Sequence, residues 1–377
     1  MAIVFDSDAG TITGLSVGGL PDGTVDAGTL ANNAVVTGKI ADGTIANADI
    51  NDLAASKLTG ALPAISGAAL TGITEPPRKN FIINGGFTVN QRAAYTSATA
   101  VGAGAKTYVS DRWAVYIESI ACTYNWYDAT IDSVKRRAGK VISTGTGSSK
   151  YFHVTQQIEY ESWMEGRTIT ISGWVRTNLA GQKFRICDGV GCYTPGSVIA
   201  SDGNWAYYST QHTLPNDVSS YAAFQVHPAF ATGTFDTSTY LEWAEFKVEF
   251  GSTATAYEHR SYGEELALCQ RYFHKWDGTA GGNNTEFCIG FVTSSDRARG
   301  VYFYPQIMRS NPAISASGNF RFWDGNVRSV TSGNITVQRG NVNSSFVQFL
   351  STAGTQYRPC EMSANGADCS IDFSSEL

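Results

Sequence analysis

The chain has 377 residues, a formal net charge of −6 and only 16% charged residues, and it is rich in glycine and aromatic side chains. This length allows two or three domains. Because the charge is low and slightly acidic, and because no apolar run approaches about 18 residues, we expect neither nucleic-acid binding nor membrane insertion.

The first 78 residues differ in composition from the rest. They contain eight acidic and three basic residues and a single aromatic residue, Phe5, whereas the other aromatic residues all follow. Such a segment has too little apolar surface to form a core alone. Because Asp6 and Asp8 stand where a signal peptide would be apolar, we expect assembly in a cytoplasm rather than export. Residues 1–22 look like a short non-repetitive attachment segment.

Residues 23–78 carry a regular apolar spacing. Small and polar residues separate single aliphatic residues at every fifth position, namely Val25, Leu30, Val35, Ile40, Ile45 and Ile50. A step of five follows neither one face of a helix nor one face of a strand. Disorder needs no period, and a pentapeptide-repeat β-helix would have only about one and a half coils, so both are the weaker alternatives. We expect a homotrimeric shaft in which three parallel chains bury these positions as triplets.

From Asn80 onward the sequence is typical of β-structure. Short alternating apolar segments lie between Gly, Asn, Asp and Pro residues, as in FIINGGFTVNQR, KTYVSDRWAVYIES and RTITISGWVRTN. The first of these predicts a strand, a glycine turn and a second strand. Many short strands with turn signals predict an antiparallel β-sandwich or jelly roll over residues 79–260.

The segment RSYGEELALCQRYF changes to a helical pattern. Ser261 and Glu264 have the spacing of a capping box. Leu266, Cys269 and Phe273 follow at i, i+3 and i+7. We therefore expect a connecting helix over residues 261–273. The strand-like segments after it predict a smaller β-sandwich over residues 274–377, so the expected fold class is mainly β.

Aromatic residues beside polar ones are the candidates for sugar contacts. Sugar C–H faces stack on aromatic rings, while amide, carboxylate and guanidinium groups bond to hydroxyls. The candidates are Trp323, Asp324, Asn326 and Arg328 in the turn NFRFWDGNVR, followed by Trp276, Trp205 and Tyr207. Trp113 and Trp174 lie in alternating apolar segments, so we expect them in the core.

The sequence does not favour an enzyme or a metal site. Its five His residues have no metal-ligand spacing, and the GxSxG, P-loop and HExxH motifs are absent. Glutamate pairs such as Glu159 with Glu161 leave glycoside hydrolysis as an alternative. We expect no catalytic residue, no cofactor and no structural calcium. The seven Cys residues are expected to be buried thiols, with a disulfide between Cys187 and Cys192 left open.

Several segments, in this order, resemble bacteriophage tail fibre proteins. The five-residue repeat with ADGTIANADI is similar to a fibre shaft. NFIINGGFTVNQR followed by SDRW resembles the start of a carbohydrate-module-like jelly roll, and VEFGSTATAYEHRSYGEELALCQRYF resembles its end and the helix after it. VYFYPQIMRSNPAISASG is similar to a small tip domain. The resemblance covers most of residues 23–315; residues 1–22 and 316–377 show none.

The resemblance implies a homotrimeric tail fibre of a virion. Such a fibre docks to other tail proteins through its N-terminus and binds a host surface polysaccharide through distal β-domains. A non-adhesive structural fibre of the head or collar is the first alternative, and a tailspike-type glycan depolymerase is the second.

Overall fold

The computed structural model describes residues 4–9, 11–13, 35, 40–41, 44–45, 80–216, 223–278, 285–352, 354–366 and 368–377, without the side chains of 4–6, 11–13, 149–152 and 230–233. The chain divides into two compact units, Met1–Ile73 and Thr74–Leu377. In the first unit, β1 (Val4–Asp6) pairs antiparallel with β2 (Thr11–Thr13). Most of the predicted shaft lies outside the described residues.

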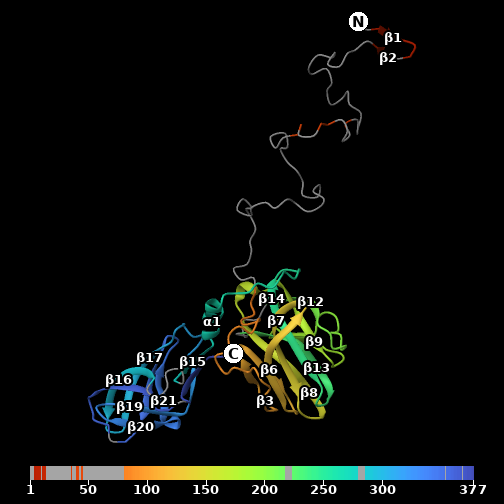
Figure 1. Cartoon of the computed structure of the whole chain (residues 1–377). Helices are drawn as coiled ribbons and strands as arrows, with labels where there is room; N and C mark the ends of the chain where they lie inside the picture. The colour runs from red at the N-terminus through yellow and green to blue at the C-terminus, as the bar shows by residue number, and fades with distance from the viewer. Residues whose placement is uncertain are drawn as a thin grey trace. The chain divides into compact units, whose positions relative to one another are not determined.

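The second unit begins with a sandwich of two six-stranded antiparallel sheets (Figure 1). We call them the pocket sheet and the aromatic sheet. The pocket sheet has the order β11-β10-β13-β8-β5-β4, with strands Cys192–Tyr193, Lys183–Cys187, Ala223–Phe235, Gly147–Glu159, Trp113–Ile117 and Thr107–Ser110. The aromatic sheet has the order β12-β9-β14-β7-β6-β3, with strands Ala206–Thr213, Thr168–Thr177, Tyr240–Phe250, Val134–Ser143, Cys122–Ile131 and Thr99–Val101.

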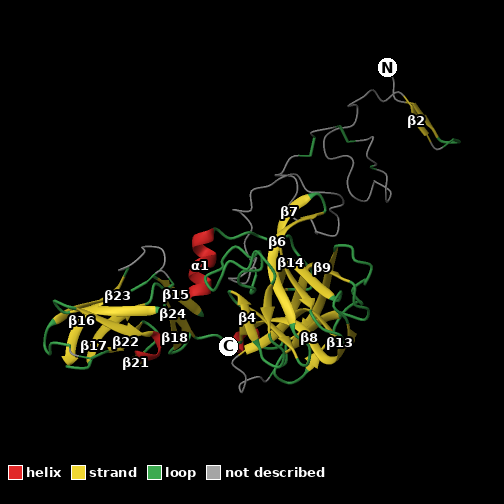
Figure 2. Cartoon of the chain, turned by 60° about the horizontal axis from the view of Figure 1, so that its bottom comes forward, coloured by secondary structure: helices red, strands yellow, loops and turns green. Residues whose placement is uncertain are grey.

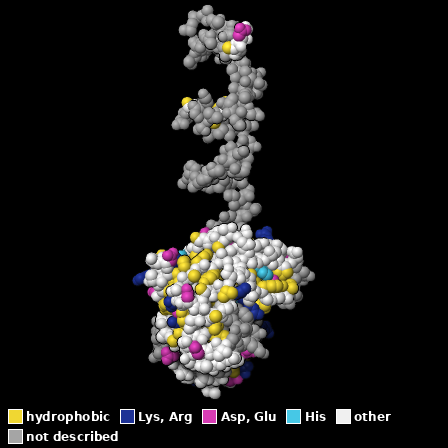
Figure 3. Space-filling model, turned by 90° about the vertical axis from the view of Figure 1, so that its right-hand side faces the viewer, with side chains coloured by type: hydrophobic (Ala, Val, Ile, Leu, Met, Phe, Trp, Pro, Cys, Tyr) yellow, Lys and Arg dark blue, Asp and Glu magenta, His cyan; other side chains and the backbone are white. Residues whose placement is uncertain are grey.

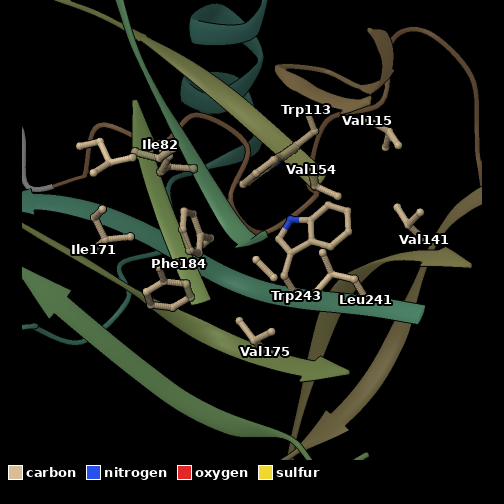
Figure 4. Packing of buried hydrophobic residues seen from close by; sticks show 14 of the residues in the cluster. Ile82, Trp113, Val115, Val141, Val154, Ile171, Val175, Phe184, Leu241 and Trp243 are labelled. Carbon is tan, nitrogen blue, oxygen red and sulfur yellow. The ribbon is translucent and has the colours of Figure 1, made fainter. Parts of the chain in front are cut away.

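A core rich in aromatic residues joins the inner faces of these two sheets. Trp113 of the pocket sheet and Trp243 of the aromatic sheet have no exposed surface, and their ring centroids lie 5.5 Å apart. Aliphatic residues of both sheets surround them (Figure 4). Complete burial of each large apolar side chain contributes roughly 1.5–3 kcal/mol. The core position predicted for Trp113 is confirmed.

Residues 81–92 enter this core as a loop, and the two strands predicted there are absent from the described structure. The N–H of Ile83 donates to the side-chain oxygen of Gln156 at 2.8 Å, and the N–H of Asn84 donates to the Glu265 carboxylate at 2.6 Å. Buried backbone donors must find acceptors. Here side chains supply those acceptors, so this apolar segment is buried without joining a sheet.

The predicted helix is present as α1 (Tyr262–Gln270). Its capping box is confirmed, since Ser261 accepts from the N–H of Glu264 and the Glu264 carboxylate accepts from the N–H of Ser261. The helix ends earlier than predicted, because Phe273 begins a strand and pairs with Ser374. Pairing with a distant strand thus overrides the helical spacing at this position.

The C-terminal part contains two further antiparallel sheets (Figure 2). One has the order β15-β24-β18, with strands Phe273–Asp277, Ser370–Ser374 and Ala313–Ser317. The seven-stranded sheet has the order β20-β19-β23-β16-β17-β22-β21, with strands Val327–Thr331, Asn319–Trp323, Pro359–Ala364, Glu286–Ser294, Arg297–Phe303, Ser344–Leu350 and Ile335–Gly340. Stacked rings of Phe287, Tyr302 and Phe373 lie in the core of this part. The fold is mainly β, as predicted.

The last residues of the chain contact the first sandwich. The buried guanidinium of Arg112 donates to the Glu376 carboxylate, and Arg92 pairs with the same carboxylate at 2.9 Å. The Tyr108 hydroxyl donates to the Leu377 carbonyl oxygen at 2.8 Å. The C-terminal strand region is therefore tied to the pocket-sheet edge by charged and polar contacts.

Candidate functional site

The outer face of the pocket sheet gathers polar and aromatic side chains from several strands. Strand residues alternate between faces. Since Val115, Val154 and Val226 point into the core, their neighbours point outward. The outward residues of interest are Tyr116 of β5, His153 of β8, Gln225 and His227 of β13, and Arg185 of β10. In the strand register Tyr116 lies opposite His153, and Arg185 lies opposite His227.

These side chains, with Cys187 and Cys192, line a cavity of about 250 Å³, which we call the histidine pocket. The rings of Tyr116 and His153 are stacked with centroids 5.4 Å apart. The His227 ring meets His153 edge to face at 4.7 Å. The pocket therefore combines aromatic surface with an amide, a guanidinium and two imidazoles.

His227 stands out because its ring is buried and poorly hydrogen-bonded. It is 1% exposed, neither ring nitrogen makes a hydrogen bond of standard geometry within the described residues, and the Val154 backbone is the polar group that approaches the ring. Burial, reinforced by nearby positive groups such as Arg185, lowers the pKa of His227 well below 6.5 and that of His153 to about 4. Both rings are thus neutral at pH 7. A neutral imidazole offers one donor and one acceptor, and an unmade buried hydrogen bond costs about 1–3 kcal/mol. A hydroxyl-bearing ligand in the pocket meets the partly exposed Tyr116, His153 and Gln225 first, and it reaches the His227 ring only if neighbouring side chains shift.

A disulfide between Cys187 and Cys192 forms one wall of the pocket. The expectation of buried free thiols is therefore wrong for this pair, for which a disulfide was the open alternative. It holds for Cys122, Cys269, Cys360 and Cys369, whereas Cys288 is free but partly exposed. The two residues are direct partners in the β10–β11 hairpin. Asp188 holds the hairpin turn, because its carboxylate accepts from the N–H of Gly191 at 3.0 Å. Strand pairing, which sequence spacing does not reveal, brings the two sulfur atoms together.

The aromatic sheet carries a row of side chains on its outer face. In register across neighbouring strands lie Tyr207, Trp174, Ala244, Ala138 and Tyr127. In the adjacent row Glu242 is completely buried and pairs with Lys140 at 3.0 Å and with Arg176 at 2.6 Å. The ring of Trp205 lies 5.2 Å from the Arg176 guanidinium. The structure thus brings the predicted residues Trp205 and Tyr207 to one face, opposite to the histidine pocket.

Trp174 lies on this outer face, so its predicted core position is wrong. Its ring is half-buried, 5.4 Å from the Tyr207 ring and 5.2 Å from the Arg136 guanidinium. Ile171 and Val175 take the inward positions of β9. Because side chains alternate, residue 174 must face outward. Trp174 and Val175 are adjacent and both apolar, so the sequence does not show which of the two points into the core.

The turn between β19 and β20 brings together the four predicted residues of NFRFWDGNVR. Trp323 is exposed, whereas Asp324 is buried. The Asp324 carboxylate accepts from the N–H groups of Thr355 at 2.6 Å and Asn326 at 3.3 Å, and Arg328 approaches it at 3.4 Å. These contacts use the Asp324 oxygens to hold the turn. Trp323 is thus the member of the group that presents its ring to solvent.

Trp276, another predicted sugar contact, is half-buried and packs into the C-terminal core. Its ring centroid lies 5.3 Å from that of Phe287 and 6.2 Å from that of Phe320. Alternation along β15 turns it toward that core. Its ring surface is therefore largely taken up by packing.

Three of the predicted trimer-core positions are described. Val35, Ile40 and Ile45 are exposed in the single chain, while Val25, Leu30 and Ile50 lie outside the described residues. Burial of these positions between chains stays a prediction.

Other chemistry on the described residues is limited. Burial opposes ionisation of Glu159, but hydrogen bonds from Arg271 and Tyr272 outweigh it and lower its pKa.

Within the described ranges, no three His, Cys, Asp or Glu side chains form a metal-binding group. No helix in the described part of the chain has the length and apolarity to span a bilayer. On the face drawn in Figure 3, hydrophobic groups alternate with scattered charges of both signs.

Comparisons with known proteins give structural neighbours and no family. No protein-family model matches the chain, and no curated protein matches it. Similar solved structures include the enzymatically active domain of bacteriophage CBA120 tailspike protein 4, with 14% identity, a TM-score of 0.28, and coverage of 46% of this chain and 21% of that chain. The CBM22-1 xylan-binding domain of Paenibacillus barcinonensis Xyn10C has 13% identity and a TM-score of 0.27, covering 43% of this chain and 99% of that one.

A cyclase from Fischerella sp. TAU is also similar, with 10% identity, a TM-score of 0.32, and coverage of 47% of this chain and 99% of that chain. The present chain spans about a fifth of the tailspike chain. These neighbours have different activities, and none of them assigns a ligand to this chain.

Proposed function

We propose that this chain is a subunit of a homotrimeric virion tail fibre and that its histidine pocket binds one sugar unit of a host surface polysaccharide. The observation that carries the binding step is the cavity of about 250 Å³ in which the stacked Tyr116 and His153 rings lie beside Gln225, Arg185 and the buried His227 ring. This combination of aromatic surface with an amide and a guanidinium suits a ligand that carries hydroxyl groups beside C–H surface.

The composition of the pocket supports a sugar. The stacked Tyr116 and His153 rings offer aromatic surface for C–H groups, and Gln225 offers both a donor and an acceptor for hydroxyls. Ligand sites of drug size enclose roughly 300–1,000 Å³. A pocket slightly below that range admits one ring of a longer polysaccharide, whose other units would lie along the open sheet face.

The fibre part of the proposal rests on the five-residue spacing of residues 23–50 and on the resemblance to tail fibres. Three linked copies raise overall avidity by roughly 10²–10⁴ over one weak contact. Residues 1–22 would dock to other tail proteins. We propose binding without cleavage, since the Glu242 carboxylate is held by Arg176 and Lys140, and Glu159 by Arg271.

Substitution in the pocket tests this proposal. Tyr116→Ala in the full chain removes the stacking ring, and Gln225→Ala removes an amide. We expect each variant to bind its best polysaccharide about tenfold more weakly, because one such contact contributes about 0.5–1.5 kcal/mol and about 1.4 kcal/mol corresponds to tenfold in affinity. The measurement is binding to immobilised bacterial surface polysaccharides, with adsorption to host cells as a second readout.

Tyr207→Ala is the matched control, since it removes an exposed tyrosine from the opposite face of the same sandwich. It should bind like the unaltered chain. If Tyr207→Ala abolishes binding while Tyr116→Ala does not, the aromatic sheet is the binding face and the histidine pocket is not. If the unaltered chain binds no polysaccharide on the array and no host cell, the proposal fails altogether.

A further inference from the structure

The seven-stranded sheet presents a group of large apolar side chains to solvent. They are between 41% and 75% exposed, and we call them the apolar tip face: Ile289, Phe291, Val301, Phe303, Trp323 and Val327. Exposed apolar residues scattered singly are normal, but a contiguous group marks an interaction site. The opposite face of the same sheet is already covered, because residues such as Phe322 and Val347 are buried in the C-terminal core.

The strand register makes the apolar tip face continuous. Val327 lies opposite Trp323, and Trp323 lies opposite Glu361. Glu361 in turn lies opposite Ile289 on β16. Gly290 pairs with Gly300 in the antiparallel register, so Ile289 lies opposite Val301 of β17. The apolar side chains thus form one row across neighbouring strands, with Phe291 and Phe303 on either side of it.

The size of this face suits a protein–protein contact. A large apolar side chain covers roughly 200 Å² when fully exposed. Three of the six residues are smaller Val or Ile side chains, so the face presents several hundred Å² of surface in all. The largest apolar patch on a typical monomer is about 300–600 Å², and each partner of a standard stable interface buries about 800 Å².

The charges within the face indicate that its partner is another copy of the chain. Glu361 lies in the middle of the row, where Arg321 of the same chain approaches it at 3.8 Å. Arg299 lies opposite Phe291 on the neighbouring strand and donates to the neutral side chain of Gln348, so it has a hydrogen-bond partner but no carboxylate there. A copy related by a symmetry axis can set its Arg299 near Glu361 of the first, so the face complements itself in both charge and apolarity. A sugar would find few hydrogen-bonding groups here, in contrast to the histidine pocket.

We infer that copies of this chain pack their apolar tip faces against one another around a common axis. This inference rests on the proposed function only in that a shared shaft would hold the copies close together. It adds a second contact between copies, far along the chain from the repeat. Each face then buries surface that would otherwise favour aggregation.

Cysteine cross-linking in the full chain tests the inference. Val301→Cys places a thiol in the centre of the face, and mild oxidation should give covalent dimers on a non-reducing gel. The matched control is Val134→Cys, because Val134 is similarly exposed and is the first residue of β7 in the first sandwich. We expect at least a tenfold larger dimer fraction for Val301→Cys. Equal fractions would overturn the inference.

A second variant distinguishes cross-linking through a packed apolar tip face from cross-linking through random collisions of copies. Phe291→Ser with Phe303→Ser, added to Val301→Cys, replaces two exposed side chains and should leave the fold intact, as checked by circular dichroism. Cross-linking should fall at least fivefold. Unchanged cross-linking would contradict packing through this face. Polysaccharide binding by the reduced variants should stay unchanged, so failure here is distinguishable from failure of the histidine pocket.

Discussion

His274 shows how a single residue couples packing to acidity. Its ring lies nearly parallel to the stacked Tyr302 and Phe373 rings, with centroid distances of 5.8 Å and 6.0 Å. Its Nε2 lies 2.6 Å from the Tyr302 hydroxyl. Burial lowers the pKa of His274 from 6.5 to about 4. The folded state therefore favours the neutral ring, because protonation would place an uncompensated charge in an aromatic core.

This environment predicts acid sensitivity. A histidine whose folded pKa is lowered contributes stability that is complete above about pH 6.5 and declines as the pH falls toward 4. The loss is at most roughly 3 kcal/mol, since each pKa unit corresponds to about 1.4 kcal/mol. Urea unfolding at several pH values measures it.

His274→Gln should flatten part of the pH dependence, although His153 and His227 shift in the same direction and keep some of it. His259→Gln, which replaces a largely exposed histidine, is the comparison variant. An identical slope in His274→Gln and in the unaltered chain would show that His274 does not titrate as expected.

At the scale of elements, β16 and β17 approach each other unusually closely. Gly290 pairs with Gly300 across the two strands. A Cβ atom at Gly290 would lie 2.0 Å from the backbone oxygen of Arg299. Because backbone cannot move aside as a flexible side chain can, this pair of strands requires glycine here. The same two strands carry much of the apolar tip face, so their spacing also sets that surface.

We predict that Gly290→Ala destabilises the chain by at least about 1–3 kcal/mol, the usual cost of overpacking. Thermal unfolding followed by circular dichroism measures the change. Gly102→Ala is the control, because a Cβ atom there meets no atom within 4 Å and the backbone dihedral is ordinary. A Gly290→Ala variant as stable as the control would mean that the strands separate easily.

For the whole molecule, the five-residue spacing predicts how many chains assemble, because its aliphatic residues need neighbouring copies to bury them. Val35, Ile40 and Ile45 are exposed in the single chain. Burial of such side chains is worth roughly 1.5–3 kcal/mol each, and three copies per layer would multiply this gain. A chain of 40.4 kDa that assembles in this way should sediment as a trimer.

A charge placed on the repeat should weaken that trimer. Ile40→Asp would set three carboxylates at one level of an apolar axis, and we expect the trimer fraction at micromolar concentration to fall at least tenfold. Thr44→Asp adds the same charge at an exposed position outside the spacing and should leave the trimer intact. Analytical ultracentrifugation compares the two. Equal dissociation of both variants, or a monomeric unaltered chain, would contradict the shaft.

Local pattern alone was enough to predict several features of this protein. The mainly β fold, the capping box at Ser261 and Glu264, and the core position of Trp113 all follow from residues close together in the sequence. Turn residues, alternation and helix caps act over short distances, so one strand or one helix end carries its own signal.

Other features depended on which distant segments meet. The histidine pocket draws Tyr116, His153 and His227 from three strands, and the Cys187–Cys192 bond depends on a hairpin register. The sequence holds one local hint. His153 precedes the inward Val154 on β8 and His227 follows the inward Val226 on β13, so alternation places both histidines on the outer face. The orientation of Trp174 likewise depended on the packing of β9, in which Ile171 and Val175 point into the core and Trp174 points to the surface. Tertiary structure decides such questions because burial and pairing energies arise between strands, whereas sequence pattern records only what each strand prefers alone.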